Sequence, residues 1–248
     1  QMYPRQYFDT FWRPGIRDEV FVAMSFDPSL QASFDDIIKP AIEEDNNLKA
    51  HRVDATSISG SITTEIMDGI AHARLVLADL TCTQEATGDP DRRYPNANVM
   101  YEVGLGHALR QDCEVILVRG DSGPLMFDVS TIRVHTYDPA DVGYSRSAIA
   151  ALVADALAEV EHVKGLKVEM AAGSFDDVCM ELGQAYGSHE TFNLPVDPTM
   201  GGVSSLLPCR LAIGRLLQLG IITAERASSG PPQFRWTEFG IAVLGRVG

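Results

Sequence analysis

The residues of this sequence best suited to chemistry lie in the segment Asn96-Ala-Asn-Val-Met-Tyr-Glu-Val-Gly-Leu-Gly-His-Ala-Leu, in which Glu102 is the one carboxylate. The spacing predicts a helix that follows a polar loop, with Glu102 in its first turn. The helix dipole favours an ionised carboxylate there by up to about 1 kcal/mol. Such a carboxylate, facing a pocket, can attack C1′ of a sugar or stabilise the transition state of N-glycosidic cleavage. A surface glutamate is the alternative interpretation.

Other polar residues stand where predicted strands end. Asp79 closes an uninterrupted apolar run, and Asp54 follows an earlier strand, where it suits either a ribose hydroxyl or a turn. Tyr101, next to Glu102, is expected to face another side of the helix. The four cysteines lie about 30 or more residues apart, and there is neither a CxxC pair nor a GxxxxGK[ST] loop. The sequence therefore predicts a site without metal or bound cofactor.

Five predicted strands alternate with helices and position these residues. The strands fall at residues 19–24, 48–53, 75–80, 115–118 and 132–137, and the helices at 33–44, 59–73, 98–109 and 145–163. This alternation predicts right-handed βαβ units and a parallel sheet, that is, a three-layer α/β domain of flavodoxin or Rossmann type. Such sheets bind ligands in the loops at the carboxyl ends of their strands. Those loops, including the long polar segment 79–98, hold most of the unusual polar residues.

The sequence divides into three parts. Residues 1–18 form an aromatic lead-in, expected to pack against its own domain or another subunit, and residues 19–165 form the α/β domain. Residues 166–248 read as a helix, a Pro/Gly-rich link, a second helix ended by Gly220, two strands around a Gly/Pro turn, and a closing helix. That order predicts a small winged-helix domain.

The net charge of −14 is unevenly distributed. Residues 1–165 hold 14 basic and 26 acidic side chains, a net charge of −12, whereas residues 166–248 hold 6 and 8. Such acidity repels phosphate backbones and anionic membranes, which argues against a nucleic-acid coating protein. The nearly neutral C-terminal domain is still expected to contact nucleic acid weakly, through Arg210, Arg215, Arg226 and Arg235, or to contact protein.

The sequence shows neither an apolar run near the roughly 18 residues of a membrane span nor a signal peptide. With its scattered cysteines, this predicts a cytoplasmic protein without a membrane partner.

Five motifs occur in order along residues 19–140: Val20-Phe-Val-Ala-Met-Ser-Phe, Arg52-Val-Asp, Gly60-Ser-Ile-Thr-Thr-Glu-Ile, Leu77-Ala-Asp-Leu-Thr and Asn98-Val-Met-Tyr-Glu-Val-Gly-Leu-Gly-His-Ala-Leu. Together they resemble the nucleoside 2-deoxyribosyltransferase-like domains, also described as TIR-like nucleotide-binding domains, which occur widely in bacterial defence proteins. The resemblance implies that Glu102 is the nucleophile on the ribosyl C1′. It also implies that Asp79 helps to hold and protonate the base.

The same resemblance implies a substrate pocket. Its residues would be Met24, Ser25 and Phe26 after the first strand and the small-residue turn Gly60-Ser61. To these we add, from their places in the sequence, the substrate-binding candidates Asp54, Asn96 and Asn98. One departure concerns Asn96, six residues before Glu102. Deoxyribosyltransferases tend to carry an aspartate there, and monophosphate hydrolases of this fold a phosphate-binding serine. The amide argues against plain base exchange between free nucleosides, but it can bind a base, a ribose hydroxyl or a phosphate.

An α/β domain of this kind followed by a winged helix resembles the effector (toxin) proteins of some bacterial retron anti-phage systems, which are thought to deplete a nucleotide. We therefore expect a nucleotide N-glycosidase of antiviral defence, with NAD entering only as a substrate. A non-catalytic nucleotide sensor coupled to the winged helix is one alternative, and a nucleoside 2-deoxyribosyltransferase is another. The resemblance also implies a homo-oligomer, because this family commonly completes its pockets across subunits.

Overall fold

The computed structural model describes residues 11–13, 15–53, 62–86, 89–122, 132–193, 203–225 and 232–247. The chain forms two compact units, one of residues 14–161 and one of residues 162–248 together with the residues up to Arg13. The division falls inside one helix, α6 (Val142–Ala172), which is longer than predicted. It continues through Lys164 and Gly165, where a boundary was expected, because one glycine costs a helix only about 1 kcal/mol.

The first unit is built on a five-stranded parallel sheet. Its strands are β1 (Arg17–Ala23), β2 (Lys49–His51), β3 (Ala73–Asp79), β6 (Val115–Arg119) and β7 (Val134–Thr136). They lie in the order β2-β1-β3-β6-β7. This is the order of flavodoxin-type sheets, in which the direction of winding reverses between β1 and β3. The predicted α/β class with a parallel sheet is confirmed.

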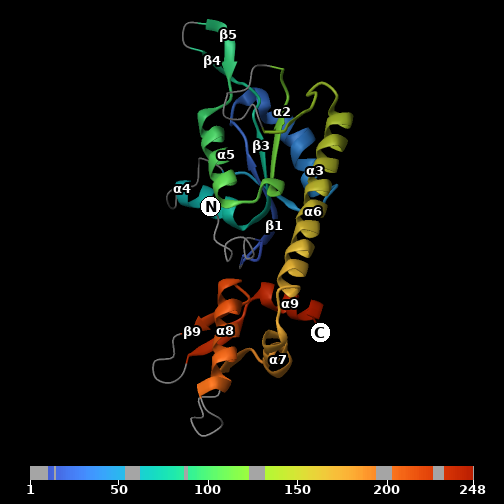
Figure 1. Ribbon diagram of the computed structural model, residues 1–248. Coiled ribbons are helices and arrows are strands. Elements are labelled where there is room, and N and C mark those ends of the chain that lie inside the picture. The colour runs from blue at the N-terminus through green and yellow to red at the C-terminus, as the bar shows by residue number, and fades with distance from the viewer. Residues whose placement is uncertain are drawn as a thin grey trace. The chain divides into compact units, whose positions relative to one another are not determined.

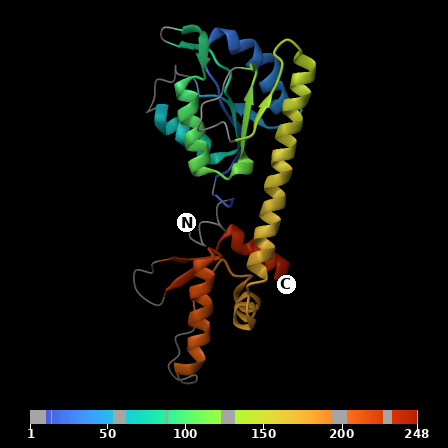
Figure 2. The same cartoon turned by 45° about the horizontal axis from the view of Figure 1, so that its top comes forward.

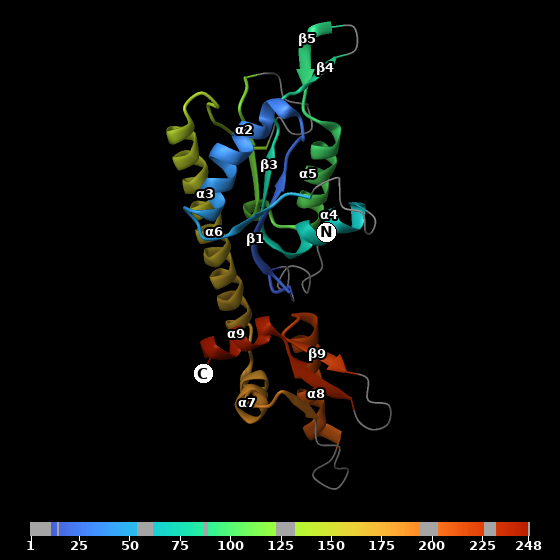
Figure 3. The same cartoon turned by 180° about the vertical axis from the view of Figure 1, so that it is seen from behind.

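Helices cover both faces of this sheet (Figures 1 and 3). On one face lie α4 (Ile62–His72) and α5 (Ala97–Leu109); on the other lie the first part of α6 and the helical stretch made of η1 (Pro28–Leu30), α2 (Gln31–Ser33), η2 (Phe34–Ile38) and α3 (Lys39–Glu43). Because side chains alternate along a strand, neighbouring strand residues face different helices. Val76 and Ala78 of β3 pack in one core with Val99 and Val103 of α5.

The segment between β3 and α5 contains a hairpin where only a loop was predicted. Strands β4 (Gln84–Ala86) and β5 (Asp89–Tyr94) pair antiparallel, and Figure 1 shows them at one end of the sheet. Their sequences, Gln-Glu-Ala and Asp-Pro-Asp-Arg-Arg-Tyr, lack the alternation of apolar residues that marks a half-buried strand. The sequence pattern therefore cannot reveal this pairing.

Arg110, directly after α5, joins the ends of α5 and α4. Its guanidinium donates hydrogen bonds to the carbonyl oxygens of Ile70, Ala71, Ala73 and Arg74, at 3.1, 3.2, 2.6 and 2.6 Å. It also pairs at 2.7 Å with Glu114 of η3 (Asp112–Glu114), and the two side chains are only 1% and 3% exposed. The last carbonyls of a helix have no partner within the helix. Arg110 supplies that partner to α4.

The second unit combines three further helices with an antiparallel sheet (Figure 2). The helices are α7 (Asp177–Tyr186), α8 (Val203–Gln218) and α9 (Glu238–Val247), and the strands are β8 (Thr191–Asn193), β10 (Gln233–Trp236) and β9 (Ile222–Glu225), in that order across the sheet. Strand β8 was not predicted. Its Phe192 stacks between Tyr186 and Trp236 in the core of the unit.

The described part of the aromatic lead-in belongs to this second unit. The rings of Trp12 and Phe239 lie 4.5 Å apart between their centres, and Phe11 is buried under the ammonium of Lys167. The lead-in was expected to pack against its own domain or another subunit, but its described residues pack against the C-terminal unit of the same chain and not against the α/β unit that follows them in sequence. Among the described residues, no helix is long and apolar enough to span a membrane.

Gly240 of α9 provides a test of the second unit. A Cβ atom at this position would lie 2.0 Å from the carbonyl oxygen of Ile221, so Gly240→Ala must displace main chain. We expect a loss of roughly 1–3 kcal/mol, as in other overpacked cores. Gly245→Ala in the same helix meets no atom within 4 Å and should stabilise by up to about 1 kcal/mol. Hydrogen exchange of the unit measures both changes, and equal effects would contradict this packing.

Arg110 provides a test of the first unit. Arg110→Ala removes the ion-pair partner of the buried Glu114 carboxylate and the donor to several carbonyl groups, and we expect a loss of roughly 3–5 kcal/mol in the free energy of unfolding. The matched control is Arg74→Ala, which breaks an exposed ion pair with Asp18 and should cost no more than about 1 kcal/mol. Urea unfolding compares the two. A small loss for both variants would show that Arg110 does not hold the helices together.

Candidate active site

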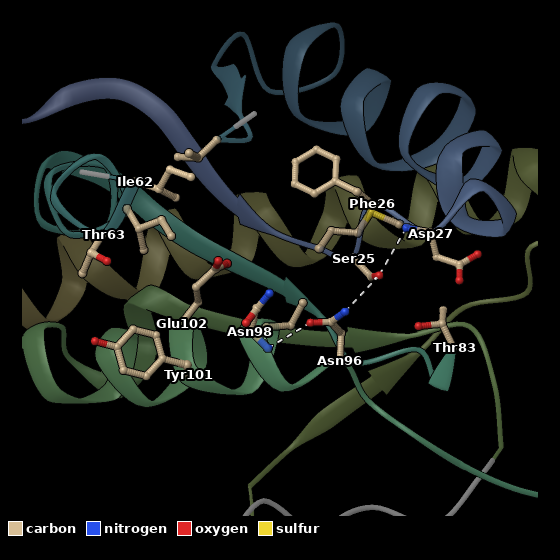
Figure 4. A pocket seen from close by; sticks show the side chains of 14 residues that line it. Ser25, Phe26, Asp27, Ile62, Thr63, Thr83, Asn96, Asn98, Tyr101 and Glu102 are labelled. Carbon is tan, nitrogen blue, oxygen red and sulfur yellow. Dashed lines mark hydrogen bonds between the residues drawn. The ribbon is translucent and has the colours of Figure 1, made fainter. Parts of the chain in front are cut away.

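A cavity of about 650 Å³ lies at the carboxyl ends of β1, β2 and β3. Volumes of about 300–1,000 Å³ are typical of small-molecule sites, and open parallel sheets bind ligands where their winding reverses. The described lining comes from the segments after β1, β2 and β3, from α4 and from the start of α5 (Figure 4): Met24, Ser25, Phe26, Asp27, Val53, Ile62, Thr63, Ile66, Thr83, Asn96, Asn98, Val99, Tyr101 and Glu102.

A second cavity of about 680 Å³ is the weaker candidate. It is lined by residues at the end of α5 and the start of β6, among them His107, Cys113 and Val115. It therefore lies toward the amino ends of the strands, away from the usual ligand position. Within the described residues, no group of histidine, cysteine and acidic side chains could hold a metal ion. The cavity that contains Glu102 is the candidate active site.

Glu102 enters the cavity from the second turn of α5, not from the first turn as predicted. The helix begins at Ala97 with Asn96 as its N-cap, so Glu102 is its sixth residue. Figure 4 shows the carboxyl group pointing into the cavity. Burial raises its pKa to about 7. The expected stabilisation of the charged form by the helix dipole is absent because that effect is limited to the first turn.

The described lining of the cavity is negatively charged. It holds two carboxylates, Asp27 and Glu102, and no lysine, arginine or histidine. Residues 54–61, which lie outside the described residues next to Val53, contain no basic side chain in their sequence either. A phosphate placed beside Glu102 would therefore be repelled. The surroundings of Glu102 suit a neutral sugar and base, or a positive charge that develops at C1′.

Asn96 links the start of α5 to the segment after β1. Its Oδ1 accepts a hydrogen bond from the backbone N–H of Asn98 at 2.9 Å, and its Nδ2 donates to Ser25 Oγ at 3.4 Å. The same Ser25 Oγ accepts the backbone N–H of Asp27 at 3.2 Å. Both polar atoms of the Asn96 side chain are thus used within the protein. We conclude that Asn96 positions the helix that carries Glu102.

Asp79 does not lie in this cavity. Because side chains alternate along β3, it points to the same face as Leu77, whereas Ala78 faces the core under α4 and α5. Its carboxyl group accepts hydrogen bonds from Thr81 N–H at 2.9 Å and from Tyr137 O–H at 2.7 Å, and burial raises its pKa. The side chain anchors the end of β3. The implied role in protonating the base beside Glu102 has no support in this arrangement.

The structure thus brings together some of the predicted site residues. Glu102 shares the cavity with Met24, Ser25, Phe26, Asn96 and Asn98, whereas Asp54, Gly60 and Ser61 lie outside the described residues. Tyr101 was expected to face elsewhere but lines the cavity, as do Asp27, Thr63 and Thr83, which the sequence did not single out. Thr63 lies on α4 and Tyr101 on α5. The sequence did not indicate how each helix is turned about its own axis, and therefore which of its side chains face the cavity.

The raised pKa of Glu102 predicts a pH-dependent stability. Unfolded glutamate ionises near pH 4.5 but folded Glu102 near pH 7, so the stability contributed by the neutral form is lost as the pH rises between these values. Glu102→Gln keeps the shape without the charge. It should raise the free energy of unfolding at pH 8 and leave it unchanged at pH 4, as measured by urea unfolding. Glu181→Gln, an exposed site on α7, controls for the loss of one negative charge. An equal effect at both pH values would contradict the burial of Glu102.

Comparison with known proteins assigns this chain to no family. The sequence matches no protein-family model, and no curated protein matches it. The resemblance to nucleoside 2-deoxyribosyltransferase-like domains therefore depends on the five motifs alone. A function has to be inferred from those motifs together with the geometry of the cavity.

Proposed function

We propose that this protein cleaves the N-glycosidic bond of a nucleotide or nucleoside, with Glu102 as the nucleophile. One observation carries the proposal: a glutamate without a hydrogen-bond or ion-pair partner among the described residues points into a cavity of about 650 Å³ at the winding reversal of the sheet. A half-buried carboxylate with no cation beside it in the described lining is stabilised by positive charge on a ligand. The oxocarbenium-like transition state at C1′ supplies that charge.

The proposed reaction has two steps. A Glu102 carboxylate oxygen bonds to C1′ while the bond from C1′ to the base nitrogen breaks. The electron pair of that bond leaves with the base, which takes up a proton from water if it was neutral before. A water molecule then attacks C1′, releases the carboxylate and gives up a proton. NAD, nucleoside monophosphates and nucleosides all contain a bond of this type. Because the described lining of the cavity carries only negative charge, we expect the phosphates of NAD or of a nucleoside monophosphate to lie away from Glu102.

A non-catalytic nucleotide sensor is the second candidate. Asp79 lies outside the cavity, and Asp27, the other carboxylate of the described lining, accepts hydrogen bonds at the start of η1, from Ser29 N–H at 2.9 Å and Ser29 O–H at 2.6 Å. The described cavity therefore offers no carboxyl group committed to protonating a departing base. A site of this kind can bind a nucleoside without cleaving it.

We propose that the second unit is a winged helix used for protein contact. The proposal is supported by ion pairs that neutralise two of its arginines. Arg215 pairs with Asp176, and Arg235 pairs with Glu190 and Glu225. Neutralised guanidinium groups release few counterions from a nucleic acid. Arg226 lies outside the described residues, and Arg210 is exposed.

Two leucines on α8 also favour a protein partner. Leu207 and Leu211 lie one helical turn apart and are 56% and 66% exposed. Large exposed apolar side chains on one helix face are typical of contact surfaces between proteins. On the motif resemblance we extend the proposal to a homo-oligomeric, cytoplasmic anti-phage effector whose nucleotide-cleaving unit is controlled through such contacts.

The decisive test of the function is the release of free base. Purified protein is incubated with NAD, nucleoside monophosphates and nucleosides, and the products are separated by chromatography. We expect base release that rises with pH through about 7, since only ionised Glu102 attacks C1′. Glu102→Gln should lower the rate by a factor on the order of 10³ or more. Glu65→Gln, on α4 and outside the lining, is the matched control.

Three other outcomes would each change the account. Nucleotide binding without base release by the wild type would favour the sensor. Transfer to an added acceptor base that outruns hydrolysis would favour the transferase. If Glu102→Gln released base as fast as the wild type, Glu102 would take no part in the reaction.

A further inference from the structure

Arg52 contacts one wall of the cavity without lining it. It follows β2 directly, and its guanidinium donates a hydrogen bond to the carbonyl oxygen of Ser25 at 2.7 Å. The Cζ atom of the same group lies 4.0 Å from the centre of the Phe26 ring and 4.8 Å from that of the Phe34 ring. Ser25 and Phe26 line the cavity, whereas Arg52 and Phe34 do not. Arg52 thus contacts the segment after β1 that forms this wall of the cavity.

These contacts require an arginine. A planar guanidinium can stack on aromatic rings and donate a directed hydrogen bond at the same time, whereas the ammonium of lysine offers only a point charge. The two rings come from different elements, Phe26 from the segment after β1 and Phe34 from η2. One side chain thereby fixes both the main chain at Ser25 and the plane of the Phe26 ring.

Phe26 is 52% exposed although it is an apolar residue. Figure 4 shows its ring and the Glu102 carboxyl group facing the same space from different elements. An aromatic ring exposed beside a polar cavity offers a stacking surface for a nucleobase, since every base has a π-face. A ring fixed in advance also loses less conformational entropy when a ligand binds.

We propose that Arg52 is a positioning residue that holds the ring of Phe26 as the stacking platform for the base whose glycosidic bond Glu102 attacks. The inference deepens the proposed function and rests on it. Arg52 touches neither the substrate nor the reacting atoms. Its effect is to hold the ring on which the base binds, before Glu102 attacks C1′.

The test compares three substitutions in steady-state base release by the full-length protein, with the substrate that the wild type cleaves best. Arg52→Ala should raise KM about tenfold, which corresponds to about 1.4 kcal/mol, and change kcat by less than about twofold. Arg52→Gln should recover part of the loss because its planar amide can stack on Phe26 and donate to Ser25. Arg52→Lys should do no better than Arg52→Ala, although it keeps the charge.

Phe26→Leu and Phe26→Tyr separate positioning from folding, because both keep Arg52 intact. Phe26→Leu should raise KM as Arg52→Ala does, and Phe26→Tyr should leave it close to the wild-type value. If Arg52 acts through the ring, Arg52→Ala adds nothing further once Phe26 is replaced by leucine. Thermal unfolding midpoints identify any variant that loses the fold. If an Arg52 variant does so, the comparison of KM between Phe26→Leu and Phe26→Tyr tests the stacking role of the ring.

The outcomes distinguish this inference from the function on which it rests. A wild type that releases no base contradicts the proposed function itself. If the wild type cleaves, the positioning role is overturned by any of three results: an unchanged KM in Arg52→Ala, full recovery in Arg52→Lys, or additive effects of Arg52→Ala and Phe26→Leu. An unchanged KM in Phe26→Leu would overturn the stacking platform.

Discussion

The position of the two helices that line the cavity depends on one buried arginine outside it. Arg110 follows α5 and binds the carbonyl oxygens at the end of α4 and the start of β3, while its charge is balanced by Glu114. Since α4 carries Thr63 and α5 carries Glu102, this group ties together the two helices that supply these side chains to the cavity. Water cannot replace its hydrogen bonds because both side chains of the pair are buried.

Within this frame three polar side chains of the cavity wall, those of Ser25, Asp27 and Asn96, form hydrogen bonds within the protein. Asn96 caps α5 and bonds to Ser25, and Asp27 receives hydrogen bonds from Ser29. Glu102 has no such partner among the described residues, and its burial without a neighbouring cation raises its pKa to about 7. A group kept partly uncharged at a free energy cost is characteristic of functional sites. In the proposed reaction, positive charge develops at C1′ in the transition state, and this charge stabilises the ionised Glu102 carboxylate.

The sequence predicts the parallel sheet from the alternation of apolar strands with helices, and it predicts Glu102 as a site residue from its place in a helix that follows a polar loop. The sequence does not show which face of β3 carries Asp79. The preceding residues 75–78 are all apolar and are buried on both faces of the sheet, so their pattern does not indicate that Asp79 points away from Glu102. The sequence of the hairpin β4–β5 contains no apolar alternation that would predict it. The roles of Arg52 and Arg110 were equally hidden, because they bind main-chain oxygens of segments far away in the sequence.

The central claim, that Glu102 forms a bond to C1′, is tested most directly by trapping that bond. The protein is incubated with a substrate nucleoside or nucleotide whose 2′-fluorine destabilises the oxocarbenium-like transition states and slows turnover. It is then quenched in acid and digested, and the peptides are weighed by mass spectrometry. The account predicts a glycosyl adduct on the peptide that contains Glu102, and none in Glu102→Gln. Release of base in the same sample without any adduct on that peptide, and at the same rate in Glu102→Gln, would contradict it.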